Sequence, residues 1–149
     1  MGVLSREGPF WDAMAGRTPQ PPAARTLGLQ FVDADPGAGT IDLAFTAREE
    51  WTNPFGNVLG AFIAAMLYDT VGPALLATLE PDQFQSTEDI AVEFIRPLRP
   101  GRVTARGRVV ERVDDTAKLE ATLFDADGPI ATCTASARVV GIAAAQRSV

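Results

Sequence analysis

A long apolar segment in the first half of the chain constrains the fold more than any other feature. Residues 58–67 contain no charged side chain, and Tyr68 and Asp69 follow directly. A helix that is apolar on all sides must be buried on all sides. We therefore predict a buried central helix over residues 57–79, with a kink at Pro73 beside the acid.

Two features of this segment indicate a possible catalytic site. Burying an acid inside an apolar helix is costly unless the acid is hydrogen-bonded. Asp69 is therefore expected to have either a structural partner or a function. The first turn of a helix also leaves backbone N–H groups without partners, and with the helix dipole these can stabilise a developing oxyanion. The turn before the helix supplies Asn53, Gly56, Asn57 and Gly60.

Alternation of apolar and polar residues predicts the strands. In residues 40–46, for example, Ile41, Leu43 and Phe45 fall on one face. We predict strands at residues 29–32, 40–46, 89–96, 102–113, 117–125 and 130–140. The helix then lies between the second and third of five or six antiparallel strands. The predicted fold is therefore α+β, with an antiparallel sheet wrapped around one long central helix.

The two ends of the chain lie outside this pattern. Residues 9–16 are predicted to form a short helix, and residues 18–25, which contain three prolines, an extended connector. We assign residues 1–27 to this N-terminal helix and connector, residues 28–142 to one sheet-and-helix domain, and residues 143–149 to a tail.

The absence of histidine from the 149 residues narrows the possible chemistry. It excludes the usual Ser-His-Asp and Cys-His arrangements, and with one cysteine it argues against a catalytic zinc site. We predict no metal site. Proton transfer in an enzyme of this composition would fall to carboxylates, Tyr68, Lys118 or water. The sequence also lacks the glycine motifs that bind nucleotide phosphates.

Charge and hydropathy limit the possible binding partners and the cellular compartment of the protein. The net charge of −6 and the lack of a Lys/Arg cluster argue against nucleic acid as a partner. Residues 58–67 are about half as long as a membrane span. The N-terminus shows no signal pattern, and the single Cys133 suits a reducing compartment. We expect a cytoplasmic protein that binds neither nucleic acid nor membranes.

Several motifs, taken in order, resemble one known family. They are Asn53-Pro-Phe-Gly56-x-x-x-Gly60 before the apolar helix, Ser86-Thr-Glu-Asp-Ile90 running into Phe94-Ile-Arg-Pro97, and Leu123-Phe-Asp-Ala-Asp-Gly128 followed by Ala131. Over residues 29–140 the chain resembles the hotdog-fold thioesterases, in particular the PaaI-like group related to 4-hydroxybenzoyl-CoA thioesterases. The resemblance implies a hotdog fold and hydrolysis of an acyl- or aryl-CoA thioester.

The resemblance also implies roles for individual residues. Asn53 and the backbone N–H of Gly60 would hold the thioester carbonyl. Asp69, contributed across a dimer interface, would activate water as a general base, and Thr87 would assist. Coenzyme A would be part of the substrate and not a retained cofactor. We expect a homodimer or a homotetramer.

Five more residues are predicted to lie beside the substrate: Leu59, Ala61, Tyr68, Phe94 and Arg96. Leu59 and Ala61 stand where the family usually has His or Gln and the second glycine of a pair. Tyr68 occupies the usual position of the acid, so Asp69 comes one residue later. On a helix this is a rotation of about 100° and a rise of about 1.5 Å.

Other interpretations of the same residues stay open. The displaced acid favours a non-catalytic hotdog module that binds acyl-CoA or a hydrophobic acyl ligand. A hydratase-type hotdog enzyme is a third possibility, although that class normally relies on histidine. Asp69 can be a structural acid, and Asn53 and Asn57 can be helix caps. A set of arginines on two neighbouring strands either faces solvent or contacts the phosphates of coenzyme A: Arg96, Arg99, Arg102, Arg106 and Arg108.

Overall fold

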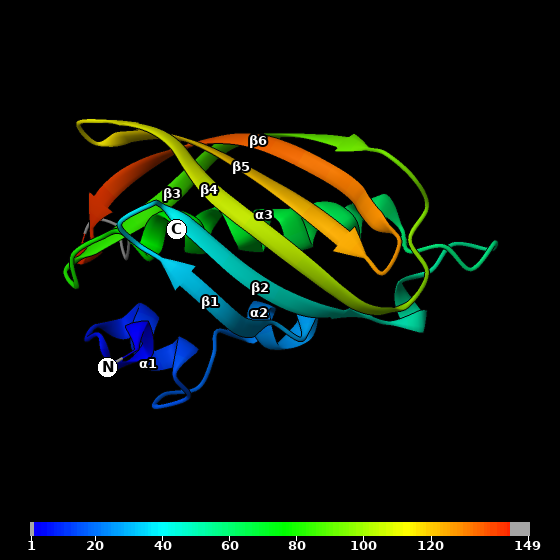
Figure 1. Ribbon diagram of the computed structural model, residues 1–149, viewed down its shortest axis with the longest axis horizontal. Coiled ribbons are helices and arrows are strands. Elements are labelled where there is room, and N and C mark those ends of the chain that lie inside the picture. The colour runs from blue at the N-terminus through cyan, green and yellow to red at the C-terminus, as the bar shows by residue number, and fades with distance from the viewer. Residues whose placement is uncertain (1, 144–149) are drawn as a thin grey trace.

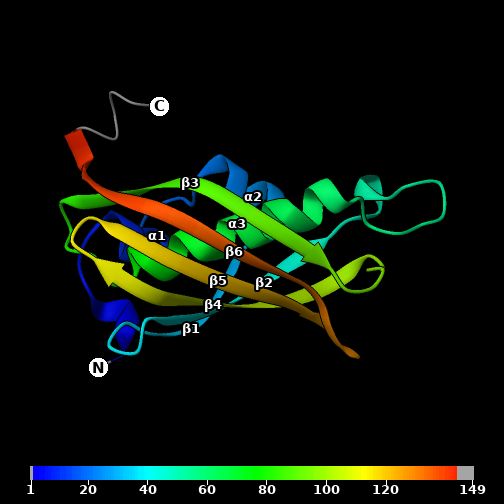
Figure 2. The same cartoon turned by 90° about the horizontal axis from the view of Figure 1, so that it is seen from above.

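One curved sheet wraps around one long helix in the structure, a computed structural model that describes residues 2–143 (Figures 1 and 2). The helix is α3 (Gly60–Leu76). The strands are β1 (Gln30–Asp35), β2 (Thr40–Ala47), β3 (Gln83–Phe94), β4 (Gly101–Val113), β5 (Thr116–Asp125) and β6 (Gly128–Gly141). All neighbours are antiparallel, in the order β1-β2-β4-β5-β6-β3. The α+β hotdog prediction is confirmed.

The core lies between the concave face of the sheet and α3. The inward-facing residues of β2, β4 and β5 and one side of α3 are almost fully buried: Ile41, Leu43, Phe45, Val103, Leu119, Leu123, Met66, Leu67, Val71 and Leu75. Gly107 on β4 allows a close approach of helix and sheet. A Cβ atom there would lie 3.0 Å from the carbonyl oxygen of Thr70. This packing holds the middle of α3 rigidly against the sheet.

Both ends of α3 differ from the predicted 57–79. The chain stays extended up to Leu59 because Val58 pairs with Thr52 and donates its N–H to the carbonyl of Leu98 at 2.8 Å. The helix therefore begins at Gly60. It runs through Pro73 and ends at Leu76, after which only turns follow.

The N-terminal segment contains one confirmed and one wrong prediction. The short helix α1 (Pro9–Met14) is present as predicted. The predicted extended connector at residues 18–25 is wrong, because a second helix, α2 (Pro22–Leu27), begins inside it. Pro22 stands in the first turn, where a helix tolerates proline because its missing N–H would have no partner. α2 ends at Gly28, which has the left-handed φ of 66° that favours glycine.

The start of the third strand and the C-terminal tail also have predicted boundaries. The third strand begins at Gln83, well before the predicted residue 89. The predicted tail at residues 143–149 lies outside the described residues except for Ala143. Among residues 2–143, no helix is both long and apolar enough to cross a membrane.

One face of α3 stays uncovered within a single chain. Ala61 is exposed, and the side chain of Tyr68 is 48% exposed. Leu59, directly before the helix, is also 48% exposed. The strands at the two edges of the sheet are β1 and β3.

Candidate active site

Asp69 lies in the second half of α3 and carries an unpaired carboxylate. Its Oδ2 atom is buried and has no hydrogen-bond partner among the described residues. Burial raises the pKa of Asp69 from 3.8 to about 6, because removal from water disfavours the charged form. A buried polar atom without a partner is rare and calls for an explanation. Within one chain, the described residues therefore provide no hydrogen-bond partner that would explain Asp69 as a purely structural acid.

A polar pair on β3 lies on the same side of α3 as Asp69. The hydroxyl of Thr87 donates a hydrogen bond of 3.0 Å to Oε1 of Gln85, which is buried. The Gln85 amide packs against α3 one turn after Asp69, where a Cβ atom on Gly72 would lie 2.9 Å from Nε2. Gln85 is not among the residues predicted from the sequence. Its position two residues before Thr87, on the same face of a strand, is the signal that indicates it.

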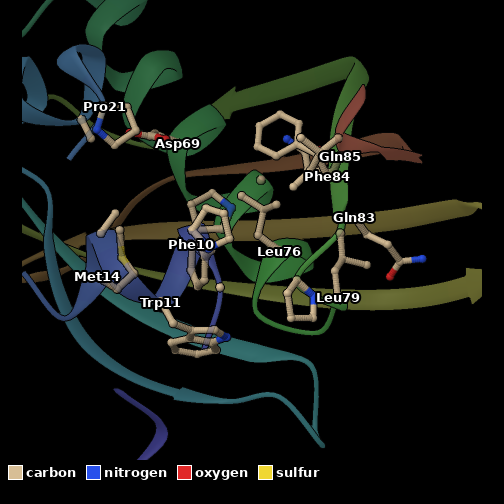
Figure 3. Close-up of a pocket in the computed structure, with 18 of the residues that line it drawn as sticks. Phe10, Trp11, Met14, Pro21, Asp69, Leu76, Leu79, Gln83, Phe84 and Gln85 are labelled. Atoms are coloured by element: carbon tan, nitrogen blue, oxygen red, sulfur yellow. The ribbon is translucent and has the colours of Figure 1, made fainter. Parts of the chain in front are cut away.

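Asp69, Gln85 and Thr87 line one cavity of about 600 Å³. Figure 3 shows Phe10, Trp11 and Met14 of α1 on one side of it, and Leu76 and Leu79 on the other. Apart from these polar groups, the walls are mainly apolar. A volume of this size and a few converging polar groups are typical of a small-molecule site.

The start of α3 forms a second candidate region. No side chain caps the helix. The N–H of Phe62 donates to the carbonyl of Leu59 at 2.9 Å, but the N–H groups of Gly60 and Ala61 have no acceptor among the described residues and are available to a ligand. Leu59 and Ala61 flank Gly60 and are exposed. The ring of Phe94 covers Gly60, and a Cβ atom on Gly60 would lie 3.1 Å from it. Gly60 thus combines a free N–H with a close contact that favours glycine.

Asn53 organises the loop before the helix instead of capping the helix. Its Oδ1 accepts hydrogen bonds from the N–H groups of Phe55 at 2.9 Å and Asn57 at 3.2 Å. The interpretation of Asn53 and Asn57 as helix caps is wrong, because the cap position is Leu59. The loop extends beyond the start of α3 (Figure 2).

The predicted catalytic residues fall into two separate groups. Asp69 and Thr87 share the cavity, whereas Gly60 lies nine residues earlier on the same helix. At 1.5 Å per residue, this separation is about 13 Å along the helix axis. One chain cannot place both Gly60 and Asp69 against the same carbonyl group.

The arginines are engaged within the chain. Arg96 forms an ion pair with Asp125 and donates to the carbonyl of Gly128 at 2.8 Å, so the structure gives it a partner other than substrate. The hydrogen bond from Arg96 lowers the pKa of Asp125. Four other side chains also have partners: Arg99 with Phe55, Arg102 with Gln30, Arg106 with Asp42, and Arg108 with Glu120. Residues 2–143 contain no cluster of acidic or cysteine side chains placed to hold a metal ion.

The raised pKa of Asp69 predicts how stability depends on pH. The folded state binds more protons than the unfolded state between pH 3.8 and about 6, so the free energy of unfolding falls as pH rises through this window. Asp69→Asn removes this cost, which is at most about 3 kcal/mol. We expect the variant to melt at a higher temperature than wild type at pH 7.5, and the difference to shrink towards pH 4. Calorimetry measures this, and an equal difference at both pH values would contradict it.

The chain has matches among known protein families and curated proteins. A family model described as the thioesterase superfamily matches residues 55–132, more than half of the chain. This span includes Gly60, Asp69 and Thr87 but not Asn53. A provisionally named esterase from Saccharolobus solfataricus is 25% identical over 104 residues, which cover 70% of this chain and 72% of the relative.

Solved structures of similar proteins match a larger part of the chain than the family model does. One is a crystal structure from Ralstonia eutropha, described provisionally as a thioesterase and as a phenylacetic acid degradation-related protein. It is 30% identical with a TM-score of 0.84, and the match covers 87% of this chain and 98% of that one. The PaaI protein of E. coli, described as from the phenylacetic acid degradation operon, shares the fold. It has a TM-score of 0.77 at 15% identity, over 89% of this chain and 94% of that one.

Proposed function

Because the chain belongs to the thioesterase superfamily, we propose that it hydrolyses the thioester of an acyl- or aryl-CoA to a carboxylic acid and coenzyme A. The observation that carries the proposal is the buried, unpaired carboxylate of Asp69 in a mainly apolar cavity. With a pKa of about 6, this group is mostly deprotonated at neutral pH and still basic enough to accept a proton. Coenzyme A is part of the substrate, and no other cofactor is required.

In the proposed reaction, Asp69 removes a proton from a water molecule as the water oxygen attacks the thioester carbonyl carbon. The tetrahedral intermediate then collapses, the carbon–sulfur bond breaks, and the proton on Asp69 passes to the departing sulfur. Thr87 orients the water. Its hydroxyl hydrogen is already directed to Gln85, so the oxygen lone pairs are left to accept a hydrogen bond from the water.

The oxyanion of the intermediate needs donors that Asp69 cannot provide. We assign them to the N–H of Gly60 and the side-chain amide of Asn53, with Leu59, Ala61 and Phe94 as neighbouring substrate contacts. Since Gly60 and Asp69 of one chain lie about 13 Å apart along α3, the donors come from a second copy. The proposed active form is a homodimer, or a homotetramer built from such dimers.

The uncovered face of α3 supports this assembly. Ala61 and Tyr68 expose apolar surface along the helix. Leu59, directly before the helix, and Phe94, whose ring covers Gly60, are also exposed. Sedimentation at micromolar concentration is therefore expected to show a dimer or larger species. A stable 15.8 kDa monomer would contradict both the assembly and the shared site.

A panel of acyl-CoA thioesters, assayed for thiol release with a chromogenic reagent, tests the proposed function. The panel includes aryl-CoA esters, because the description of the Ralstonia eutropha relative refers to phenylacetic acid degradation. Thiol release above the uncatalysed rate supports hydrolysis. Tight binding of the same esters without thiol release would favour the second candidate function, a non-catalytic module that binds acyl-CoA.

The position of Tyr68 is the observation behind that second candidate. Tyr68 occupies the usual place of the family's acid and lines an apolar groove of about 410 Å³ next to Asp69. If catalysis improves with an acid at this position, Tyr68→Asp should raise kcat over wild type. It should also lower the melting temperature slightly, because the half-exposed ring is lost and two acids become adjacent.

Tyr68→Asn is the matched control for this prediction, because it removes the same ring without adding a charge. Steady-state kinetics on one acyl-CoA ester compares the variants. A folded Tyr68→Asp protein that binds the ester and is no faster than a slow wild type would favour the binding module.

A further inference from the structure

We propose that the N-terminal segment forms the outer wall of the site for the acyl group, and that this site selects large, uncharged, apolar acyl groups. The inference rests on the proposed thioester hydrolysis. We call the cavity of about 600 Å³ between the N-terminal segment, α3 and the start of β3 the acyl chamber. Asp69 and Thr87 lie on its wall, so an acyl group inside it has its carbonyl end within reach of the proposed base.

The wall of the chamber opposite α3 comes from residues outside the sheet and the central helix. Phe10, Trp11 and Met14 of α1 line it (Figure 3). Trp11 is only 4% exposed, and its ring contacts Phe10 edge-on at 5.0 Å between centroids and Phe31 of β1 at 6.1 Å. Without this segment, the chamber would be an open groove beside α3.

The wall is held in place by specific contacts. The guanidinium of Arg17 donates to Asp12 at 2.8 Å and to the carbonyls of Leu4 at 2.7 Å and Arg6 at 2.8 Å. The backbone of Gly8, with a φ of 120°, lies against Pro81, where a Cβ atom would be only 3.3 Å away. These contacts fold the segment on itself and fix it to the turn between α3 and β3. A wall fixed in this way sets a definite size for the chamber.

The volume of the chamber favours large acyl groups. A water molecule takes up about 30 Å³ in the liquid, so 600 Å³ has room for roughly 20 non-hydrogen atoms. An acetyl group would leave most of it unfilled. Each methylene buried against apolar walls strengthens binding by about fourfold, so a ten-carbon acyl group gains far more than an acetyl group.

The charges of the chamber favour uncharged acyl groups. Three acids line it, namely Glu7, Asp69 and Glu80, and the lining found among the described residues includes no lysine or arginine. A second carboxylate at the far end of an acyl chain would lose hydration without gaining a cation. The chamber should therefore take a decanoyl group and reject the decanedioyl group of equal length.

Hydrolysis kinetics test this selection with three esters, acetyl-CoA, decanoyl-CoA and decanedioyl-CoA. We expect kcat/KM for decanoyl-CoA to exceed that of the other two by at least tenfold. Ala13→Phe adds a ring to the chamber wall and should lower kcat/KM for decanoyl-CoA by tenfold or more, with little change for acetyl-CoA. Ala15→Phe is the matched control, because Ala15 follows α1 but does not line the chamber.

Tryptophan fluorescence tests occupancy of the chamber independently of catalysis. The chain has two tryptophans, and only Trp11 lines the chamber, since Trp51 stacks on Phe62 at 4.8 Å. In Trp51→Phe, the uncharged probe decanamide should change the Trp11 emission saturably, and acetamide should not. In Trp11→Phe, the emission of Trp51 should not respond to either probe.

The outcomes separate this inference from the proposed function. Hydrolysis with equal kcat/KM for acetyl- and decanoyl-CoA, together with a silent Trp11, would overturn the inference and leave thioester hydrolysis standing. A Trp11 response to decanamide without hydrolysis of any ester would contradict the proposed function and support the chamber as an acyl-binding site. Equal effects of Ala13→Phe and Ala15→Phe would overturn the role of the N-terminal wall.

Discussion

Replacing Asp69 with Asn is expected to lower kcat for acyl-CoA hydrolysis by about 10²- to 10⁴-fold, the usual contribution of a general base. The side chain keeps its size but can no longer accept a proton from water. The fold should be unaffected, because the carboxylate oxygen Oδ2 makes no hydrogen bond among the described residues. Single-turnover kinetics on the best ester of the panel, with circular dichroism of the same sample, measures both effects.

Two comparisons make this result specific to Asp69. Asp82→Asn removes one acid from an exposed position outside the cavity and should leave kcat unchanged. In wild type, kcat/KM should fall below about pH 6, where Asp69 becomes protonated. If Asp69→Asn hydrolyses the ester as fast as wild type, Asp69 is not the base and the proposed mechanism is wrong.

Most of the fold was predictable, because the alternation of apolar and polar residues and the apolar runs indicate which residues are buried. The strands β2, β4, β5 and β6 lie close to the predicted ranges, since each has one face on the core and one in solvent. The first half of β3, Gln83-Phe-Gln-Ser-Thr87, was missed because its polar residues conceal the pattern. Likewise, three prolines conceal α2, although a proline is well placed in the first turn of a helix.

The candidate site was less predictable, because it depends on contacts between distant segments. The sequence predicts Asp69 and Thr87 as site residues, and the structure places both on one cavity. The position of Gln85 two residues before Thr87 suggests only that both side chains share a face, and the packing of β3 against Gly72 is needed to show that the amide is buried. The N-terminal wall was not foreseen. Nothing local in residues 9–14 indicates that Trp11 packs on β1 and faces α3 across a cavity.

Gly60→Pro is expected to lower kcat by about 10²- to 10³-fold, the cost of losing one oxyanion donor. Proline removes the N–H of residue 60 but suits this position, because Gly60 is the first residue of α3 and does not have a positive φ. Leu59 before it is already extended, with ψ of 137°, as a residue preceding proline must be. The helix should therefore form normally.

Gly60→Ala is the matched control for Gly60→Pro. It places the same Cβ atom against the ring of Phe94 but keeps the N–H. Phe94 is 55% exposed and can shift, so we expect Gly60→Ala to retain most of the activity. Equal loss of kcat in both variants would show that Gly60 serves packing against Phe94 and not the oxyanion.

A mixture of Gly60→Pro and Asp69→Asn tests whether one active site uses two chains. If the two chains of a symmetric dimer share two sites, half of the mixed dimers are hybrids, and each hybrid contains one site with both Gly60 and Asp69 intact. Activity should then recover to about a quarter of wild type, although each variant alone is nearly inactive. The variants must be mixed during refolding or co-expression so that chains exchange. A mixture no more active than its components, with hybrids present by mass spectrometry, would place donor and base within one chain and contradict the shared site.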